Sequence, residues 1–314
     1  MRPALFFAIL AAKRYKKKHN LPDVRVLDEK HLEKFSLENK NRNYDCTTVD
    51  DKYKKGLNLE RIDLPNCSSW LISKDDNPKD KVLYYIHGGG FVNGSTRDAF
   101  RFVSYATKHF GYNVYSIDYR TTPDHVCLDT ISDVENGYKT LLERYKPKDI
   151  ILMGESAGGN LVFALTHRLK DLGLPLPGGI ISCSPVVQFL HYAYSYYECS
   201  NKTDYGITFG INAIVEYYRG ELPLDHPYVS PLLGDLSNLP PTYIDASDKE
   251  SLRDEARMMY VRLKEEGVDV EYHELKDFFH AMLTASHIGY VKREEYPHII
   301  RFINKVFKKE NYEK

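Results

Sequence analysis

The stretch GESAGG, residues Gly154–Gly159, constrains the fold more than any other part of this chain. It follows a short apolar run, Asp149–Met153, and precedes the helix-like segment Asn160–Leu165. A strand that turns sharply through glycines into a helix, with a serine at the apex, is typical of a nucleophile elbow. Glycines allow the strand and the helix to cross closely, and Ser156 is expected to have a strained backbone. Ser156 is therefore the candidate nucleophile; the alternative is a glycine-rich turn that binds phosphate.

Strands and helices are expected to alternate along most of the chain. This pattern predicts an α/β fold with a mainly parallel central sheet and helices on both faces, since right-handed crossovers place them there. Strands are expected at residues 57–64, 68–73, 82–86, 113–118, 150–153, 178–183, 242–246 and 268–275, and helices at 97–110, 128–145, from 157 onward, 252–266 and 296–308.

Length and spacing predict one catalytic domain with a cap. The chain has 314 residues, which one α/β sheet with insertions can absorb. A long, tyrosine-dense connection between the strands expected at 178–183 and 242–246 is assigned to a cap insertion at about 186–225. We expect a catalytic domain at 57–314 and an N-terminal cap segment at 1–56.

Charge and cysteine content narrow the class of partner. Lysine and arginine number 43 against 44 acidic residues, so no global field attracts nucleic acid, and a small-molecule partner is expected. The five cysteines are odd in number and contain no C-x-x-C pair, so reduced structural thiols are expected. No histidine fits a zinc-binding spacing, and neither a metal nor a cofactor is expected.

The apolar segment Pro3–Ala12 precedes a cluster of lysines and arginine. It is too short to span a bilayer, and most of its positive charge lies on the wrong side for a signal peptide. We expect an amphipathic helix that packs on the cap or rests on a membrane surface. The expected location is the cytoplasm, with peripheral membrane association as the alternative, and the sequence leaves the oligomeric state open.

Three successive glycines follow a predicted buried strand in the segment HGGGF. Such glycines let a backbone approach a ligand closely and point amide N–H groups into a cavity, as stabilisation of an oxyanion requires. The amides of Gly88 and Gly89, with that of Ala157, are expected to form this oxyanion hole, and Gly90 completes the loop. His87 is expected to order the loop by hydrogen bonding rather than to act as a base.

A serine nucleophile needs a base, and the base needs a carboxylate that holds it in one tautomer. Two carboxylates, Asp248 and Glu250, lie just past one predicted strand, and His280 lies just past the next. Loops at the carboxyl ends of parallel strands meet at one edge of the sheet, where Ser156 is also expected. The sequence therefore predicts a serine, histidine and carboxylate constellation.

Together these motifs resemble the hormone-sensitive-lipase family of α/β-hydrolases, which includes bacterial esterases and arylacetamide-deacetylase-like enzymes. The resemblance runs roughly from Val82 to Phe302. It implies the α/β-hydrolase fold, a helical cap and a catalytic triad without a cofactor. The matching segments are His87–Gly90, Tyr119–Arg120 with Pro123–His125, Gly154–Asn160, Ser230–Leu232, Leu239–Pro241 and the segment around His280.

The chain departs from the family pattern at the acid. The family commonly shows Asp-Pro-Leu-x-Asp-Glu/Asp, and alignment on the leucine of ESLRDE places Glu250 at the catalytic position. Asp248 remains the alternative acid; otherwise it suits the N-cap of the following helix. Asn160 is expected to buttress the elbow, and Glu155 either shapes the alcohol side of the pocket or lies on the surface.

The predicted function is that of a serine carboxylesterase acting on short- to medium-chain acyl esters through an acyl-enzyme. One alternative is amide or N-acetyl hydrolysis by the same triad. Another is a noncatalytic small-molecule receptor, since plant gibberellin receptors resemble this family but lack the catalytic histidine. His280 is present in this chain, which favours an enzyme.

Overall fold

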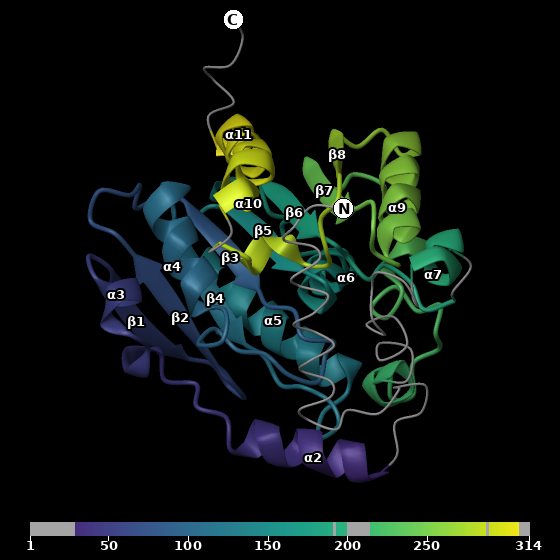
Figure 1. Ribbon diagram of the computed structural model, residues 1–314, viewed down its shortest axis with the longest axis horizontal. Helices are drawn as coiled ribbons and strands as arrows, with labels where there is room; N and C mark the ends of the chain where they lie inside the picture. Colours follow the sequence, from purple (N-terminus) through teal and green to yellow (C-terminus); the bar gives the residue numbers. More distant parts are fainter. Residues whose placement is uncertain (1–28, 191–192, 200–213, 287–288, 308–314) are drawn as a thin grey trace, which may run out of the picture.

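The computed structural model describes residues 29–190, 193–199, 214–286 and 289–307 (Figure 1). The helix predicted at Pro3–Ala12 lies outside the described residues, as do parts of the predicted cap insertion. The core is one eight-stranded sheet in the order β1-β2-β4-β3-β5-β6-β7-β8. The strands are β1 (Asn58–Asp63), β2 (Ser68–Ser73), β3 (Val82–Ile86), β4 (Asn113–Asp118), β5 (Ile150–Glu155), β6 (Gly179–Cys183), β7 (Thr242–Ser247) and β8 (Val270–Leu275).

The sheet is mainly parallel, as predicted. Strands β1 and β2 form an antiparallel hairpin, and β2 pairs antiparallel with β4. All pairs from β4 through β3 and β5 to β8 are parallel. Because these six strands point the same way, the loops after β3, β5, β6, β7 and β8 gather at one edge of the sheet.

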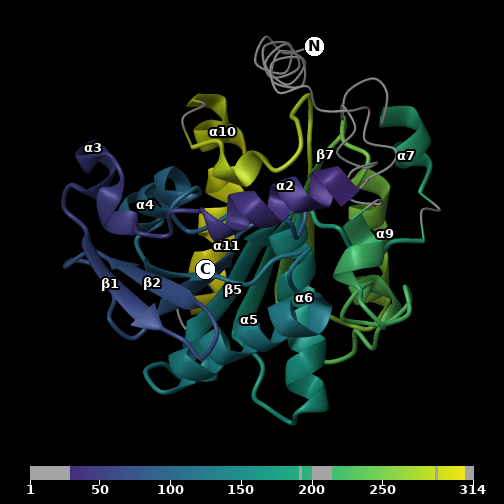
Figure 2. The same ribbon diagram turned by 90° about the horizontal axis from the view of Figure 1, so that it is seen from below.

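Helices cover both faces of the sheet. Helices α4 and α11 pack on one face, and α5, α6 and α9 pack on the other, because their buried residues belong to two separate hydrophobic clusters. Figure 2 shows the same arrangement for α4, α11, α5 and α6. The helices are α2 (Glu29–Lys40), α3 (Asp51–Lys54), α4 (Phe100–His109), α5 (Cys127–Leu142), α6 (Ala157–Asp171), α7 (Tyr194–Cys199), α9 (Arg253–Glu265), α10 (Gly289–Glu294) and α11 (Tyr296–Phe307), with short 3-10 turns at Cys46–Thr48, Pro147–Asp149, Pro231–Leu233 and Met282–Thr284.

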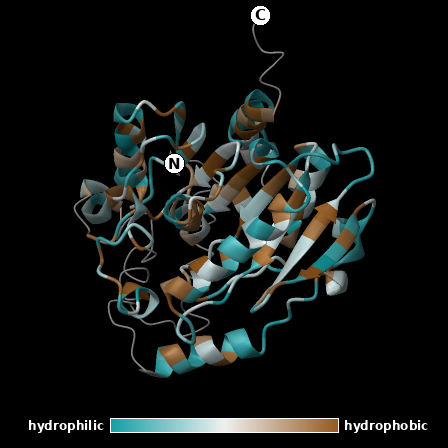
Figure 3. Cartoon of the chain, turned by 180° about the vertical axis from the view of Figure 1, so that it is seen from behind, coloured by the Kyte–Doolittle hydropathy of each residue, from teal (hydrophilic) through white to brown (hydrophobic). Residues whose placement is uncertain are grey.

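The central strands are apolar on both sides because both sides are buried. In β3, Tyr84 and Ile86 pack into the cluster with α5 and α6, whereas Leu83 and Tyr85 pack into the cluster with α4 and α11. Figure 3 shows the hydrophobic residues concentrated along these strands. A continuous apolar run in the sequence is thus the signature of a strand covered by two helical layers.

Most predicted element boundaries are confirmed within a few residues. Strands β2, β3 and β4 coincide with their predictions, whereas α4 begins at Phe100 rather than at Arg97. The sequence analysis missed α10 and the short helices at 194–199 and 214–218. Cys46, Cys67, Cys127 and Cys183 are free thiols, as expected. Among the described helices, none combines the length and the apolar character needed to cross a bilayer.

Candidate active site

Ser156 stands between β5 and α6 with φ 56° and ψ −118°. This conformation is strained for a residue with a side chain, at a typical cost of about 1–3 kcal/mol. A Cβ at Gly154 would lie 2.4 Å from the carbonyl oxygen of Gly158, and a Cβ at Gly158 would lie 2.0 Å from that of Ile86. Such contacts are too short for any side chain. The predicted elbow, with a strained serine between obligatory glycines, is confirmed.

The imidazole of His280 lies between the other two predicted site residues. Its Nε2 is 2.9 Å from Ser156 Oγ, and its Nδ1 is 2.6 Å from Glu250 Oε2. Ser156 follows β5, Glu250 follows β7 and His280 follows β8, so the parallel sheet brings the three together. A base within hydrogen-bond reach of a hydroxyl, oriented by a carboxylate, is the arrangement that activates a serine.

The carboxylate of Glu250 is fully buried and held by two serines. Its Oε1 accepts the Ser247 N–H at 2.6 Å and the Ser184 hydroxyl at 2.9 Å, which leaves Oε2 for His280. The Ser184 hydroxyl also accepts the Ala281 N–H at 3.1 Å and so ties the acid to the histidine loop. The sequence analysis missed both serines; the available signal was a polar residue at the carboxyl end of a predicted strand.

Asp248, the alternative acid, contacts Asp277 and Lys249. Its Oδ1 accepts the Asp277 N–H at 2.7 Å, and its Oδ2 lies 2.9 Å from Lys249 Nζ. It therefore braces the turn that leads to the histidine. The predicted N-cap role of Asp248 is wrong, because Leu252 is the N-cap of α9. The geometry favours Glu250 as the partner of the imidazole.

The oxyanion loop differs from the prediction at one position. The Gly88 N–H donates to Glu155 Oε1 at 2.8 Å, so its prediction as an oxyanion donor is wrong. Gly89 and Gly90 have φ of 121° and 63°, and neither amide has a hydrogen-bond partner within the described residues. The Ala157 N–H, at the first position of α6, has no partner inside its helix. These three amides remain available for a ligand.

Glu155 lies behind the oxyanion loop. Its side chain is buried, so the prediction that it could lie on the surface is wrong. Its Oε1 also accepts the Tyr85 hydroxyl at 3.0 Å, so one oxygen joins β3, the loop and β5. Burial raises the pKa of this carboxyl to about 7, against the lowering effect of the hydrogen bonds from Gly88 and Tyr85. Glu155 therefore positions the oxyanion loop.

The two remaining predicted residues have supporting contacts. The His87 ring is buried and stacked on Tyr119 at 4.2 Å, and its Nδ1 lies 2.8 Å from the Gly88 carbonyl oxygen. Burial lowers the pKa of His87 to about 4, so the ring is neutral and orders the loop, as predicted. Asn160 Nδ2 donates to the Val229 carbonyl oxygen at 2.9 Å and anchors α6 to the segment after the cap insertion.

Comparison with known proteins places this site in a family. A family model of the α/β-hydrolase fold matches residues 83–284, which is more than half of the chain. A solved esterase of the bacterial hormone-sensitive-lipase family superposes with a TM-score of 0.77 at 25% identity, and covers 98% of each chain. This chain belongs to the hormone-sensitive-lipase family of α/β-hydrolases.

Curated relatives of this family member are esterases. It is 32% identical to an esterase from Acinetobacter venetianus. The aligned 196 residues cover 62% of this chain and 64% of that esterase. It is also 30% identical to esterase LipU from Mycobacterium tuberculosis. The aligned 223 residues cover 67% of this chain and 74% of LipU. The match therefore spans about two thirds of these relatives.

Two described segments of this α/β-hydrolase family member outside the sheet lie against the loop that follows β3. Asn39, in helix α2, donates from Nδ2 to the Val92 carbonyl oxygen at 2.8 Å. From the other segment, the Tyr218 ring stacks on Phe91 with centroids 3.9 Å apart. A segment before the sheet and a segment between β6 and β7 thus both contact the loop that carries the free amides.

Proposed function

We propose that the protein is a serine carboxylesterase that hydrolyses short- to medium-chain acyl esters through an acyl-enzyme intermediate. The observation that carries this proposal is the His280 imidazole, which lies within hydrogen-bond reach of both Ser156 and Glu250. The family membership and the esterases among the relatives support the same reaction class.

In the proposed reaction, His280 Nε2 takes the proton of Ser156 as Oγ attacks the ester carbonyl carbon. The tetrahedral intermediate then collapses, and His280 returns the proton to the departing alcohol. Water repeats the attack on the acyl-enzyme, and the carboxylic acid leaves. Glu250 holds Nδ1–H throughout and stabilises the imidazolium that forms at each attack.

We propose that the amides of Gly89, Gly90 and Ala157 bind the oxyanion. Support comes from the commitment of the Gly88 amide to Glu155 and from the positive φ angles of the two following glycines. Donors already aimed at a developing charge need no reorganisation, and loss of one typically lowers kcat by about 10²–10³.

The domain proposal keeps the sequence-based division: a catalytic domain at 57–314 and a cap from 1–56 and about 186–225. The contacts of α2 and of Tyr218 with the oxyanion loop support it. Ile214 supports a small acyl pocket, because its Cδ1 would lie 3.9 Å from a Cβ at Gly90. An apolar side chain beside Gly90 supports a preference for short or medium acyl chains.

The proposal is tested with a series of p-nitrophenyl esters of increasing chain length and with an acetanilide. We expect turnover of the short esters, little turnover of the longest, and slower turnover of the amide. A fluorophosphonate should add its phosphonyl group to Ser156 with loss of fluoride, as seen by mass spectrometry, and the Ser156→Ala variant should remain unlabelled. A folded wild-type protein that neither reacts with the probe nor hydrolyses any ester would refute the enzyme proposal and favour a receptor.

We further propose that the enzyme works in the cytoplasm on a small-molecule substrate. Free thiols at Cys46, Cys67, Cys127 and Cys183 support a reducing compartment. Fractionation of source cells, with activity followed in the soluble and membrane fractions, tests this location.

A further inference from the structure

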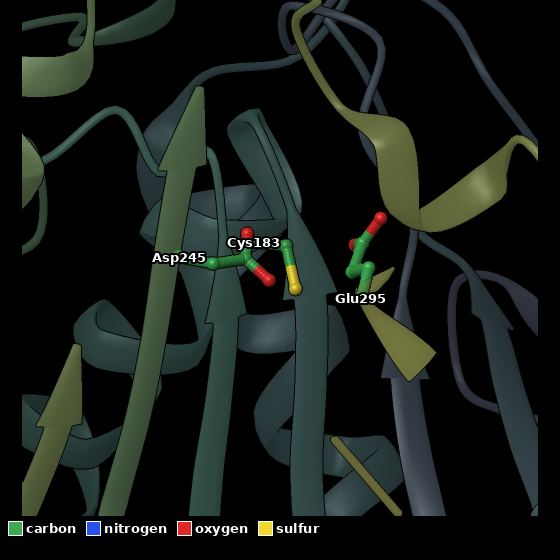
Figure 4. Close-up of side chains that lie close together, drawn as sticks. All are labelled: Cys183, Asp245 and Glu295. Carbon is green, nitrogen blue, oxygen red and sulfur yellow. The ribbon is translucent and has the colours of Figure 1, made fainter. Parts of the chain in front are cut away.

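Three side chains with metal-binding atoms converge in the core behind the active site. Cys183 ends β6, Asp245 lies on β7, and Glu295 directly precedes α11 (Figure 4). One ligand atom from each lies within 4.8 Å of the others, and all three residues are buried. They are far apart in sequence, so no spacing pattern could have indicated them.

The Glu295 carboxyl lacks the partners that a buried carboxylate needs. Both of its oxygens are buried without a hydrogen bond in the described part of the chain. The Asp245 carboxyl, by contrast, interacts with the Tyr243 hydroxyl and the Cys183 thiol. Within the same residues, no lysine, arginine or histidine forms an ion pair with either carboxylate. An ionised carboxylate that is buried without compensation costs several kcal/mol, so these carboxyls either keep a proton or bind a cation.

A shared proton is a poor explanation for this geometry. Two carboxyl groups that share a proton are joined by a hydrogen bond, yet neither oxygen of Glu295 makes one. Ligands of one zinc ion, each roughly 2.0–2.3 Å from the metal, need only lie roughly 3–4 Å apart. The three ligand atoms lie within 4.8 Å of one another, so the widest separation has to shorten by roughly 1 Å when they close around one ion.

We propose that Cys183 Sγ, Asp245 and Glu295 bind one divalent ion of the zinc class. Zinc accepts thiolate and carboxylate together, whereas calcium and magnesium take oxygen ligands. Binding releases the thiol proton of Cys183 to solvent, and the second oxygen of Glu295 supplies a fourth donor. The donor set is closed and buried, so the ion has a structural role.

The ion would join β6, β7 and α11 directly beneath the nucleophile. The Cys183 carbonyl oxygen accepts the Ser156 N–H at 3.0 Å, and the next residue, Ser184, holds Glu250. Ser184 in turn donates its N–H to the Asp245 carbonyl oxygen at 2.8 Å. A metal tie at this point would stiffen the strand ends that carry the site. The proposal does not depend on the esterase activity.

The test is the metal content of the purified full-length protein, measured by inductively coupled plasma mass spectrometry after removal of loosely bound ions. We expect about one zinc per chain in the wild type and in Cys127→Ala, a buried thiol elsewhere, and less than about a tenth of that in Cys183→Ala and Glu295→Gln. Refolding with cobalt should produce the near-ultraviolet cobalt–thiolate band in the wild type and not in Cys183→Ala.

Measurements on the wild type alone can overturn the proposal if the variants do not fold. Protein that contains no zinc, and whose unfolding midpoint is the same after refolding with zinc or with a chelator, excludes the ion. A Glu295→Gln variant that is more stable than the wild type under both conditions would also overturn it, since that result indicates a protonated carboxyl in place of a metal ligand.

Discussion

Replacement of Glu250 by glutamine should lower kcat by about 10⁴ without unfolding the protein. Oε1 of Glu250 receives two donors, the Ser247 N–H and the Ser184 hydroxyl, so the amide oxygen of the glutamine must take that position. Its NH₂ group then faces His280 Nδ1, which must become an acceptor. The ring proton moves to Nε2, which points at Ser156 and can no longer accept its proton.

The assay is hydrolysis of a short p-nitrophenyl ester, with Asp248→Asn as the matched control. The asparagine Oδ1 can still accept the Asp277 N–H, so kcat should stay within about tenfold of the wild type. KM should change little in both variants, because neither carboxylate faces the ester. Equal losses in the two variants, or a Glu250→Gln enzyme that keeps most of its kcat, would refute the tautomer argument.

Three further predictions test the supporting structure. Ser184→Ala removes one of the two donors to Glu250 Oε1, and kcat/KM for the same ester should fall about tenfold; an unchanged value would contradict the role of this hydrogen bond. Gly89→Ala would place a Cβ 2.1 Å from the Asn93 carbonyl oxygen, so activity should fall by at least about 10² with an unchanged circular dichroism spectrum, and an active variant would argue against the oxyanion loop. Burial raises the pKa of Glu255 from its ordinary value of 4.5 to about 8, so the native state keeps a proton that the unfolded state loses. The contribution of Glu255 to the free energy of unfolding should therefore fall by about 5 kcal/mol as the pH rises from about 4.5 to 8, and Glu255→Gln should remove this part of the pH dependence. Urea unfolding of both proteins across this range measures the difference, and parallel curves would contradict it.

The parts of the fold that the sequence predicted well depend on local composition. Strand β3 was predicted to the residue because it is a short apolar run between a lysine and the segment HGGG. The start of α4 was predicted too early for a nonlocal reason. The Thr96 N–H donates to Asp118 Oδ1 at 2.6 Å, which holds the chain in a turn before the helix at Phe100. No local pattern carries that contact.

The candidate site likewise has residues that the sequence could predict and residues whose role depends on a nonlocal contact. Ser156, Glu250 and His280 could be predicted because each follows a strand, and parallel strands bring such positions to one edge. Gly88 could not be excluded as an oxyanion donor, because three successive glycines offer three equivalent amides. What distinguishes them is a buried carboxylate on another strand, Glu155, which takes the first amide and leaves the next two free. Glu155 is next to the nucleophile in sequence, yet its side chain contacts the loop after β3. The hydrogen bond from the Gly88 N–H to this carboxylate thus determines that Gly89 and Gly90 are the glycines whose amides can bind an oxyanion.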